Sequence, residues 1–314
     1  MLLHPPCKIN LGLRVLRRRP DGYHDLESIF LPVPFLHDDL EITPQPAPAH
    51  SSPKLGEVPV RAEECANPVR LTLTGLALDS DPADNLCLKA YRLLKADFPD
   101  LPPVQIRLNK RIPFGAGLGG GSADAAFTLK GLNDLFDLGL TTAQLEAYAA
   151  RLGADCAFFI QCRPALAEGI GDRLTPLDNS QLSILNSQFS ISHLLLAKPP
   201  DAVSTREAYA NLKLDDNANR ARHSSPKLGE VPAGRRSVPQ LQLSTLVNDF
   251  ESSVFPAHPA IATLKAELLA LGASYAAMSG SGSTVFGLFA TREDLLAAAG
   301  TLRHTRPDCL LFHE

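Results

Sequence analysis

Hydrophobic and polar residues recur with two different periods along the chain, and these periods predict strands and helices. Within residues 69–76, Val69, Leu71 and Leu73 alternate with polar residues and Leu76 follows, a pattern typical of a strand with one buried face. Asn85, a good N-cap residue, precedes leucines and aromatic residues at helical spacing, which predicts a helix over 86–98. The same two patterns predict strands at 9–16, 104–109, 194–197, 273–278, 284–289 and 309–312, and helices at 141–152, 261–271 and 292–302.

These predicted elements mix strands and helices without a strict strand–helix–strand alternation, which indicates the α+β class. A chain of 314 residues is long for a single core and suits two domains. We expect an amino-terminal domain over residues 1–165 and a carboxyl-terminal domain over residues 166–314.

An identical decamer, HSSPKLGEVP, occurs twice, at residues 50–59 and 223–232. It is polar, with proline near both ends and a glycine inside, so it favours neither a long helix nor a central strand. A structural repeat would show looser similarity over a longer period and an apolar face. We therefore expect both copies to be inserted surface loops, with the locally repetitive segment 179–192 as a third insertion. A binding role for the duplicated motif is the alternative.

Composition and charge narrow the class of protein. The net charge is −4 and the chain has no basic tail, so a nucleic-acid partner has little electrostatic support and the short Arg17–Arg19 cluster is interpreted as solvated loop charge. No apolar run approaches the ~18 residues of a membrane span. Six cysteines lie scattered without the spacing of a zinc site. These features predict a cytoplasmic protein with reduced thiols and no membrane partner.

Five glycines fall within residues 115–121, between a predicted strand and a helix-forming stretch that begins near Ser122. Glycines permit positive φ and a close approach of the backbone to a ligand, and a helix N-terminus supplies free N–H groups and positive potential. This arrangement predicts a phosphate-binding loop, with Ser122 as the helix cap. A plain glycine turn between strand and helix is the alternative.

Two common phosphate motifs fit this loop poorly. The Walker A pattern fits from Gly115 to Gly120, but Gly121 stands where that motif has its lysine. A G-x-G-x-x-G pattern is also present, yet no acidic residue ends a second strand about 20 residues later, as a dinucleotide fold would require. An ordinary P-loop enzyme and a dinucleotide-binding protein are therefore both disfavoured.

Residues 113–126, PFGAGLGGGSADAA, resemble the ATP-binding loop of the GHMP kinases, the superfamily of galactokinase, homoserine kinase and mevalonate kinases. Residues 6–11, PCKINL, and 19–24, RPDGYH, resemble the amino terminus of the kinases that act on 4-diphosphocytidyl-2-C-methyl-D-erythritol. The segments LGAD at 152–155 and SGSGS at 279–283 resemble further motifs of that family. The chain departs from the family pattern at small residues, with Cys7 in place of alanine, Ala123 in place of a second serine, and Cys156 and Ala157 in place of valine and proline.

The resemblance implies a two-domain GHMP kinase fold, with an amino-terminal α/β nucleotide-binding domain, a carboxyl-terminal ferredoxin-like domain and a site in the cleft between them. It implies transfer of phosphate from ATP to the 2-hydroxyl of 4-diphosphocytidyl-2-C-methyl-D-erythritol, in the non-mevalonate route to isoprenoid precursors. The partner would thus be a small molecule with a cytidine diphosphate group. The ATP-binding residues would be Pro113, Gly115, Gly117, Leu118, Gly119, Gly120, Gly121 and Ser122.

Asp155 and Lys8 are the candidate catalytic residues. Phosphoryl transfer needs charge neutralisation and one group that receives the alcohol proton, and Asp155 follows a helix stop where it could take that role. Lys8 lies in an otherwise apolar strand, where a buried ammonium needs a partner, and pairing with Asp155 would provide one. The alternatives are an aspartate that caps a helix end and a lysine that extends to solvent.

The resemblance assigns the alcohol substrate to a second group of residues. Tyr23 would stack on the cytosine and His24 would hydrogen-bond its edge, while Asn10 shares the face of Lys8. The remaining substrate residues would be Gly280, Ser281 and Gly282. Mg²⁺ is expected with ATP, and Ser122 is a candidate ligand for it. The sequence carries no signal for an oligomeric state.

Two other functions stay open at this stage. One is another GHMP kinase acting on mevalonate or homoserine, which the Asp21–His24 segment disfavours. The other is a nucleotide-binding module without catalysis, which the joint presence of Lys8 and Asp155 disfavours.

Overall fold

Strands β5 (Val69–Gly75) and β6 (Val104–Lys110) run parallel and are joined through helix α1 (Leu86–Asp97), where the residue pattern predicts them. The Asn85 side chain accepts a hydrogen bond from the N–H of Cys87 at 2.9 Å and caps α1. The computed structural model describes residues 1–45, 68–77, 81–178, 193–212 and 246–314. Both decamers and the segment 179–192 lie outside the described residues.

The chain forms two compact units, each built from separate segments. The first unit comprises Met1–Pro5, His37–Phe114 and Gly120–Gln161, and the second comprises Pro6–Leu36, Gly115–Gly119 and Cys162–Glu314. The glycine-rich segment thus contributes to both units. The domain boundary that the sequence predicts at residue 165 stays a prediction.

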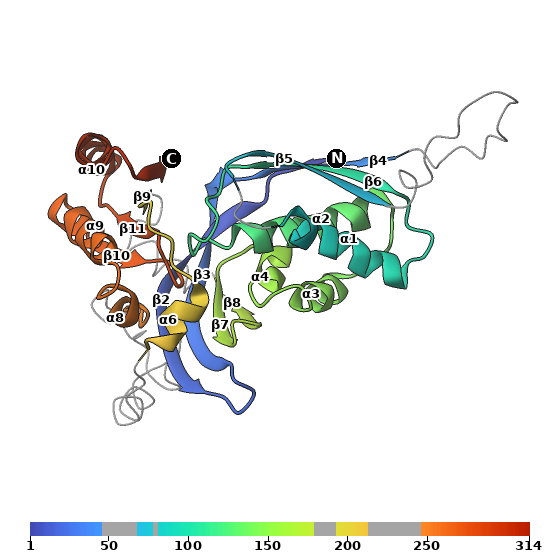
Figure 1. Cartoon of the computed structure of the whole chain (residues 1–314), viewed down its shortest axis with the longest axis horizontal. Coiled ribbons are helices and arrows are strands. Elements are labelled where there is room, and N and C mark those ends of the chain that lie inside the picture. The colour runs from blue at the N-terminus through green and yellow to red at the C-terminus, as the bar shows by residue number, and fades with distance from the viewer. Residues whose placement is uncertain (46–67, 78–80, 179–192, 213–245) are drawn as a thin grey trace, which may run out of the picture. The chain divides into compact units, whose positions relative to one another are not determined.

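The first unit is a mixed sheet covered on one face by helices (Figure 1). The strand order is β1-β4-β6-β5, with β1 (Leu2–Leu3) and β4 (Asp39–Pro44) antiparallel to their neighbours. The helices are α1, α2 (Gly120–Leu135), α3 (Thr142–Ala150) and α4 (Cys156–Gln161), with a 3₁₀ turn at Pro82–Asp84. Helix α2 approaches the sheet closely at Gly131, where a Cβ atom would lie 2.7 Å from Leu3 and 2.9 Å from Ile42.

The second unit contains two antiparallel sheets. The first has the order β2-β3-β7-β8, with β2 (Pro6–Arg18), β3 (His24–His37), β7 (Ala165–Gly169) and β8 (Arg173–Pro176). The second has the order β10-β11-β9-β12, with β9 (Leu194–Lys198), β10 (Tyr275–Met278), β11 (Val285–Leu288) and β12 (Leu310–His313).

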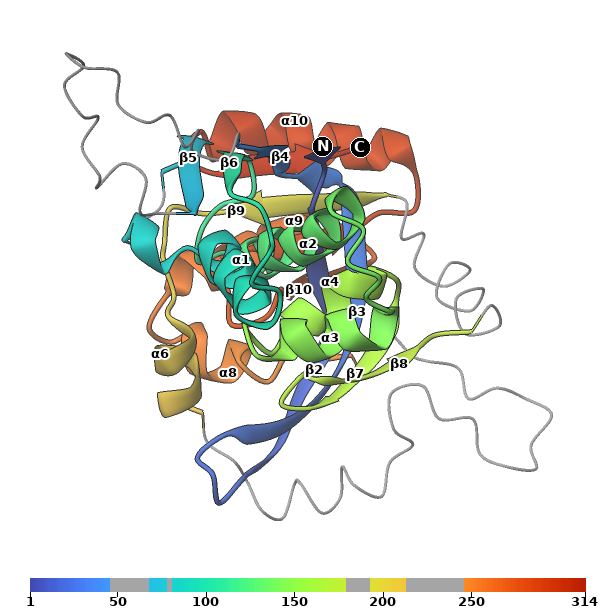
Figure 2. The ribbon, with the colours of Figure 1, turned by 90° about the vertical axis from the view of Figure 1, so that its right-hand side faces the viewer.

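Helices α9 (Pro259–Ala270) and α10 (Arg292–Thr305) cover one face of the β10-β11-β9-β12 sheet (Figure 2). The chain order β9-α9-β10-β11-α10-β12 and the strand order confirm the predicted ferredoxin-like arrangement. The short helices α6 (Thr205–Ala210) and α8 (Glu251–Val254) lie between β9 and α9 in the chain. Leu195, Leu264 and Leu302 belong to the shared core and are at most 1% exposed.

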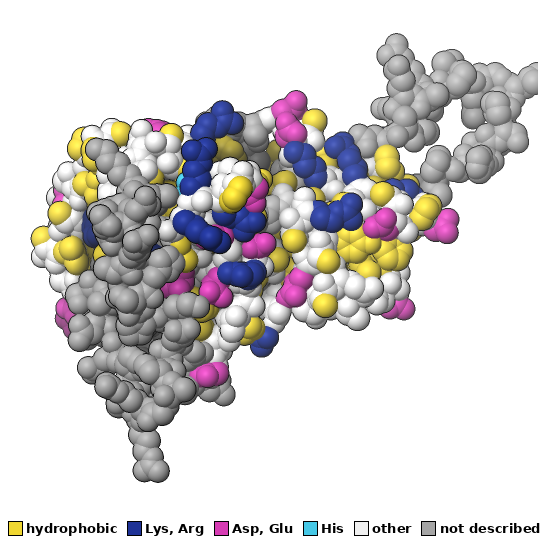
Figure 3. Space-filling model, turned by 90° about the horizontal axis from the view of Figure 1, so that it is seen from below, with side chains coloured by type: hydrophobic (Ala, Val, Ile, Leu, Met, Phe, Trp, Pro, Cys, Tyr) yellow, Lys and Arg dark blue, Asp and Glu magenta, His cyan; other side chains and the backbone are white. Residues whose placement is uncertain are grey.

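The arginines near the end of β2 are charge-compensated. Arg17 Nε lies 2.5 Å from Asp25 Oδ2, and Arg19 Nη2 lies 2.7 Å from Asp21 Oδ2. Figure 3 shows the same mixture on one face of the protein, with lysine and arginine side chains close to acidic ones. In the described ranges, no helix combines the length and the apolar character that a membrane crossing needs.

Candidate active site

The predicted phosphate loop, Gly115–Gly119, lies in the second unit in a conformation that requires glycine. Gly115, Gly117 and Gly119 have φ of 60°, 73° and 72°, a region that side chains with a Cβ rarely adopt. The intervening residues Ala116 and Leu118 are buried, and their carbonyl oxygens accept hydrogen bonds from the N–H groups of Thr284 and Lys8. The loop is therefore anchored through its backbone on both sides.

The segment Ser279–Ser283 packs directly against this loop. The Ser279 hydroxyl donates to the Gly117 carbonyl oxygen at 2.9 Å, and a Cβ on Gly117 would lie 2.0 Å from the Ser279 carbonyl oxygen. Gly280, with φ of 56°, is also close to the loop, because its Cβ would come within 3.1 Å of the Gly117 carbonyl oxygen. Of the predicted substrate residues, Gly280 thus lies at the loop, while the Ser281 hydroxyl contacts the Thr205 hydroxyl at 3.0 Å.

Lys8 and Asn10 share one face of β2, as their spacing predicts. Lys8 is 3% exposed, and its Nζ donates to Asn10 Oδ1 at 2.5 Å and lies 4.6 Å from the centroid of the Phe30 ring. Asn10 Nδ2 donates in turn to the hydroxyl of Ser28 at 2.9 Å. Since the N–H of Lys8 bonds to Leu118, the ammonium group, the phosphate loop and Gly280 belong to one packed region of the second unit.

Asn248 completes this region, although nothing in the sequence singled it out. Its Nδ2 donates to the carbonyl oxygens of Met278 and Gly280 at 2.7 and 2.8 Å, and its Oδ1 accepts from the N–H of Phe250 at 3.0 Å. All three polar groups of this buried amide thus hold the turn that carries Gly280. A single asparagine belongs to no periodic pattern, so sequence reasoning had no signal for it.

Tyr23 and His24 lie where β3 begins, after a turn at Gly22 with φ of 88°. The Tyr23 side chain is 61% exposed. The His24 ring stacks on Tyr209 of α6, with centroids 4.6 Å apart and an interplanar angle of 18°. Partial burial, with the nearby charge of Arg18, lowers the pKa of His24 below its ordinary value, so the ring is neutral at pH 7. Tyr209 was missed because its short helix lies beside segments with no clear pattern.

Ser122 and Asp155 lie in the first unit. Ser122 is the third residue of α2, which begins at Gly120, so the prediction that Ser122 caps this helix is wrong. At the start of the helix Gly120 packs on Ile112, whose Cγ2 would be 2.8 Å from a Cβ at Gly120. Asp155 immediately precedes α4, whose first residue Cys156 has a thiol that hydrogen-bonds the Ser122 hydroxyl. Burial raises the pKa of that thiol to about 11, so Cys156 stays protonated.

A buried ion cluster supports the chain where it enters the glycine-rich segment. Lys110 Nζ donates to carboxylate oxygens of Asp38 and of Asp124, the latter at 2.7 Å. Asp38 Oδ1 also accepts from the N–H groups of Arg111 and Ile112 at 2.5 and 2.8 Å. The cluster links the end of β6 to the first turns of α2, and Pro113 follows it directly.

The two carboxylates of this cluster compete for one ammonium group. Burial, together with the nearby Asp38 charge, raises the pKa of Asp124 to about 7, although Lys110 opposes the rise. The alternation of β6 places Lys110 on the same buried face as Val104, Ile106 and Leu108. The alternation of Lys110 with three apolar residues was the signal in the sequence that could have identified the ion cluster.

The site residues therefore fall into two groups. The second unit brings together Lys8, Asn10, the phosphate loop and Gly280, and it carries Tyr23 and His24 at the start of β3. The first unit carries Ser122 and Asp155. The predicted pairing of Lys8 with Asp155 stays a prediction.

Comparisons with known proteins agree on one group of enzymes. The family described as "GHMP kinases N terminal domain" matches residues 85–163, and "GHMP kinases C terminal" matches residues 235–305. A 4-diphosphocytidyl-2-C-methyl-D-erythritol kinase of Bacteroides fragilis is 46% identical over 94% of this chain and 94% of its own length. A crystal structure of 4-(cytidine 5'-diphospho)-2C-methyl-D-erythritol kinase is 30% identical, with a TM-score of 0.69 over 97% of this chain and 96% of that one. A mevalonate kinase of Methanococcus jannaschii, at 13% identity, shares the fold with a TM-score of 0.63 over 99% of this chain and 96% of that one.

Proposed function

Because the chain belongs to the GHMP kinase superfamily, in the family of the 4-diphosphocytidyl-2-C-methyl-D-erythritol kinases, we propose that it transfers the γ-phosphoryl group of ATP to the 2-hydroxyl of 4-diphosphocytidyl-2-C-methyl-D-erythritol. This reaction belongs to the non-mevalonate route to isoprenoid precursors. One observation of the structure supports it above others. A buried lysine, a loop whose glycines adopt positive φ and a second glycine turn are hydrogen-bonded into one region.

The glycine-rich segment fits a phosphate chain. Gly115 has no atom within 4 Å of the position that a Cβ would take, and Gly121 has only Leu86 at 3.9 Å, so backbone can approach a ligand at both positions. The first N–H groups of α2, at Gly120, Gly121 and Ser122, have no partner within the helix and carry the positive end of its dipole. We assign ATP binding to Pro113, Gly115, Gly117, Leu118, Gly119, Gly120, Gly121 and Ser122.

Mg²⁺ bound with ATP would neutralise charge on the phosphates. Ser122 is the candidate hydroxyl for this ion, because it lies in the first turn of α2 and a hydroxyl oxygen carries two lone pairs.

Asp155 and Lys8 carry the chemistry in this proposal. As the substrate oxygen forms its bond to the γ-phosphorus and the bond to the ADP oxygen breaks, the hydroxyl proton passes to the Asp155 carboxylate. Asp155 adjoins Cys156, which contacts the first turn of α2, so it lies near the helix N-terminus that faces the phosphates. Lys8, fixed by Asn10 and by the backbone bond to Leu118, places an ammonium group at the phosphate loop and stabilises negative charge on the transferred group.

The cytidine end of the substrate is assigned to Tyr23 and His24. The Tyr23 ring is exposed and offers a face for stacking on a pyrimidine. Tyr209 covers one face of His24 and fixes the plane of its neutral ring, so that a ring nitrogen can hydrogen-bond the base edge. Gly280, Ser281 and Gly282 are assigned to the methylerythritol phosphate side. A cytosolic location fits the free thiols of the described cysteines.

Turnover with competing alcohols tests this function. The full chain is incubated with ATP and Mg²⁺ together with 4-diphosphocytidyl-2-C-methyl-D-erythritol, mevalonate or homoserine, and ADP release is measured. We expect a kcat/KM larger by on the order of 10⁴ for the cytidylyl substrate, because a site with polar base contacts rejects alcohols that leave them unpaired. Phosphorus NMR should show a new phosphomonoester at the 2-position. Preference for mevalonate or homoserine would assign the chain to another GHMP kinase activity, and ATP binding without turnover would indicate a binding module.

A further inference from the structure

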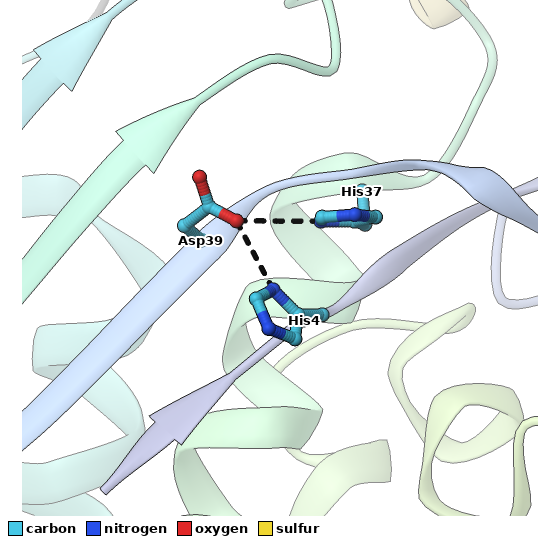
Figure 4. A group of neighbouring side chains, drawn as sticks. All are labelled: His4, His37 and Asp39. Carbon is cyan, nitrogen blue, oxygen red and sulfur yellow. Dashed lines mark hydrogen bonds and ion pairs between the residues drawn. The ribbon is translucent and has the colours of Figure 1, made fainter.

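His4, His37 and Asp39 of the first unit lie together at one edge of its sheet (Figure 4). Strands β1 and β4 pair antiparallel with Leu3 opposite Leu40, which places His4 at the level of Asp39. His37 and Asp39 are two residues apart on either side of the buried Asp38, so their side chains leave the chain in the same direction. The register of β1 with β4 brings His4 next to Asp39, and the two-residue spacing brings His37 to the same side. Three side chains of metal-binding type therefore lie together.

Two of the three distances between the candidate ligand atoms are close to those of ligands around a single ion. The Nδ1 atoms of His4 and His37 lie 3.0 and 3.4 Å from the same atom, Asp39 Oδ1, and the three ligand atoms all lie within 4.8 Å of one another. Tetrahedral zinc with bonds of about 2.0–2.2 Å separates its ligand atoms by about 3.3 Å. Figure 4 shows both rings directed at that one oxygen.

The surroundings orient the carboxylate and leave its shared oxygen accessible. Asn109 Nδ2 donates to the other oxygen, Oδ2, at 3.1 Å, which turns Oδ1 toward the two rings. The side chains of His4, His37 and Asp39 are 53%, 25% and 31% exposed, so an ion can reach them from solvent.

We propose that His4, His37 and Asp39 form a binding site for one divalent transition-metal ion of the zinc type. Imidazole and carboxylate ligands in a tetrahedral arrangement suit Zn²⁺, whereas Mg²⁺ and Ca²⁺ prefer oxygen ligands alone. Each imidazole would bind through Nδ1 as the neutral Nε2–H tautomer. The ion would thus replace the hydrogen bond of His4 Nδ1 to Asp39 Oδ1, and that of His37 Nδ1 to the carbonyl oxygen of Asp38 at 3.2 Å. Water would fill the fourth position.

The ion would hold the amino-terminal strand in place. Strand β1 has two residues, and its pairing with β4 rests on a short ladder together with bonds between Met1 and Ile42. A metal shared by His4 and Asp39 adds a second link across the same pair of strands, and His37 joins the end of β3 to it. None of the three ligands is among the residues assigned to phosphate or substrate binding. Among the described residues this site is the one group of three such ligands.

Calorimetric titration of the full chain with zinc chloride tests the proposal. We expect one high-affinity zinc ion per chain, and a loss of at least about 100-fold in affinity in His4→Gln and in Asp39→Asn, since removing a ligand costs more than the ~10–100-fold loss found on removing a hydrogen bond to one. The variant Asn109→Ala should lose about tenfold. His304→Gln, at an exposed position of α10, is the matched control and should bind like the unchanged protein.

Two further readouts separate this site from other histidines of the chain. Co²⁺ in place of Zn²⁺ should give the intense visible bands of a tetrahedral site, and the bands should vanish in the double variant His4→Gln/His37→Gln. Thermal unfolding should show that zinc raises the Tm of the unchanged protein and leaves that of the double variant unaltered. Equal zinc affinity in the double variant, or no binding to the unchanged protein, would overturn the proposal and leave only a hydrogen-bonded cluster.

Discussion

The hydroxyl of Ser279 donates a hydrogen bond to the carbonyl oxygen of Gly117 at 2.9 Å, across 162 residues of sequence. This bond joins the predicted phosphate loop to the glycine turn near the carboxyl end. Two segments that are each rich in glycine can approach this closely because no Cβ separates their backbones. The contact explains why both segments need glycine even where neither touches a ligand.

A methyl group at Gly117 should disrupt this contact. In Gly117→Ala the Cβ would lie 2.0 Å from the Ser279 carbonyl oxygen, so one of the two loops must move. The matched variant Gly115→Ala has a similar positive φ of 60° but meets no atom within 4 Å. Both variants carry the left-handed strain of about 1–2 kcal/mol. We expect Gly117→Ala to lower ATP affinity much more than Gly115→Ala, as measured by titration with a non-hydrolysable ATP analogue.

Equal ATP affinities in these two variants would contradict the role assigned to the contact. Circular dichroism of both proteins controls for unfolding, since strain at the loop alone should leave the secondary structure intact. Gly120 is a poorer test position, because a Cβ there would collide with the buried Ile112 and disturb the core of the first unit.

Removing the proposed general base should separate binding from chemistry. Asp155→Asn keeps the shape of the side chain but cannot accept the hydroxyl proton. We therefore expect kcat to fall by ~10²–10⁴ while ATP affinity changes only a few fold. The control is Asp134→Asn, an exposed aspartate of α2 in the same unit. Near-normal turnover in Asp155→Asn would refute the assignment.

Asn248 should affect substrate affinity through the turn that it holds. Asn248→Asp has nearly the same size but replaces the Nδ2 donor with an oxygen facing the carbonyl oxygens of Met278 and Gly280. Each lost bond at a buried site costs about 1–3 kcal/mol, so the turn should shift. We expect KM for substrate or ATP to rise at least tenfold, and Asn211→Asp, at an exposed position of the same unit, to show no change. Unaltered kinetics in a folded Asn248→Asp protein would show that the turn does not depend on this amide.

The sequence predicted elements well where a local pattern determined them. A capping box of Thr141 and Gln144 starts α3 where the predicted helix 141–152 begins, and Gly272, with φ of 97°, directly follows the predicted helix 261–271. The long strand β3 was missed because its proline-containing second half, LPVPF, is typical of a strand breaker. β3 is nevertheless an inner strand of its sheet, and its first half, Leu26–Phe30, before the prolines, is the part that pairs with β7. A local sequence pattern cannot show which neighbouring strands pair with a proline-containing segment.

The residues of the candidate site were likewise predictable only where a local pattern marked them. Lys8 and Asn10 could be placed on one face by strand alternation, and the glycine loop by its composition. Asn248, Tyr209 and the zinc ligands could not, because each acquires its role only when distant segments meet. The pairing of His4 with Asp39 depends on the register between β1 and β4, which two residues of strand do not reveal.

The buried Asp124 should make the stability of the protein depend on pH in an unusual direction. Its pKa is about 7 in the folded chain, because burial and Asp38 disfavour the ionised form more than Lys110 favours it. In the unfolded chain an aspartate has a pKa of about 3.9. Between about pH 4 and pH 7 the folded protein thus binds more protons than the unfolded chain at this residue, and its free energy of unfolding decreases as pH rises. The contribution is complete below about pH 4, is lost as pH rises through 7, and changes no further at higher pH.

Asp124→Asn should remove this dependence, because an amide is neutral at every pH and can donate to Asp38 as the protonated carboxyl would. Urea unfolding of both proteins from about pH 5 to about pH 8 measures the difference between their free energies of unfolding. The contributions of all other titrating groups are the same in both proteins and cancel in this difference. We expect the stability of the unchanged protein to decrease relative to Asp124→Asn by about 1.4 kcal/mol per pH unit up to pH 7 and then to level off. Asp134→Asn, exposed on the same helix, should follow the unchanged protein throughout. Parallel curves for the unchanged protein and Asp124→Asn would mean that Lys110 keeps Asp124 ionised at all these pH values, so that the cluster carries one ammonium and two carboxylate charges rather than a shared proton.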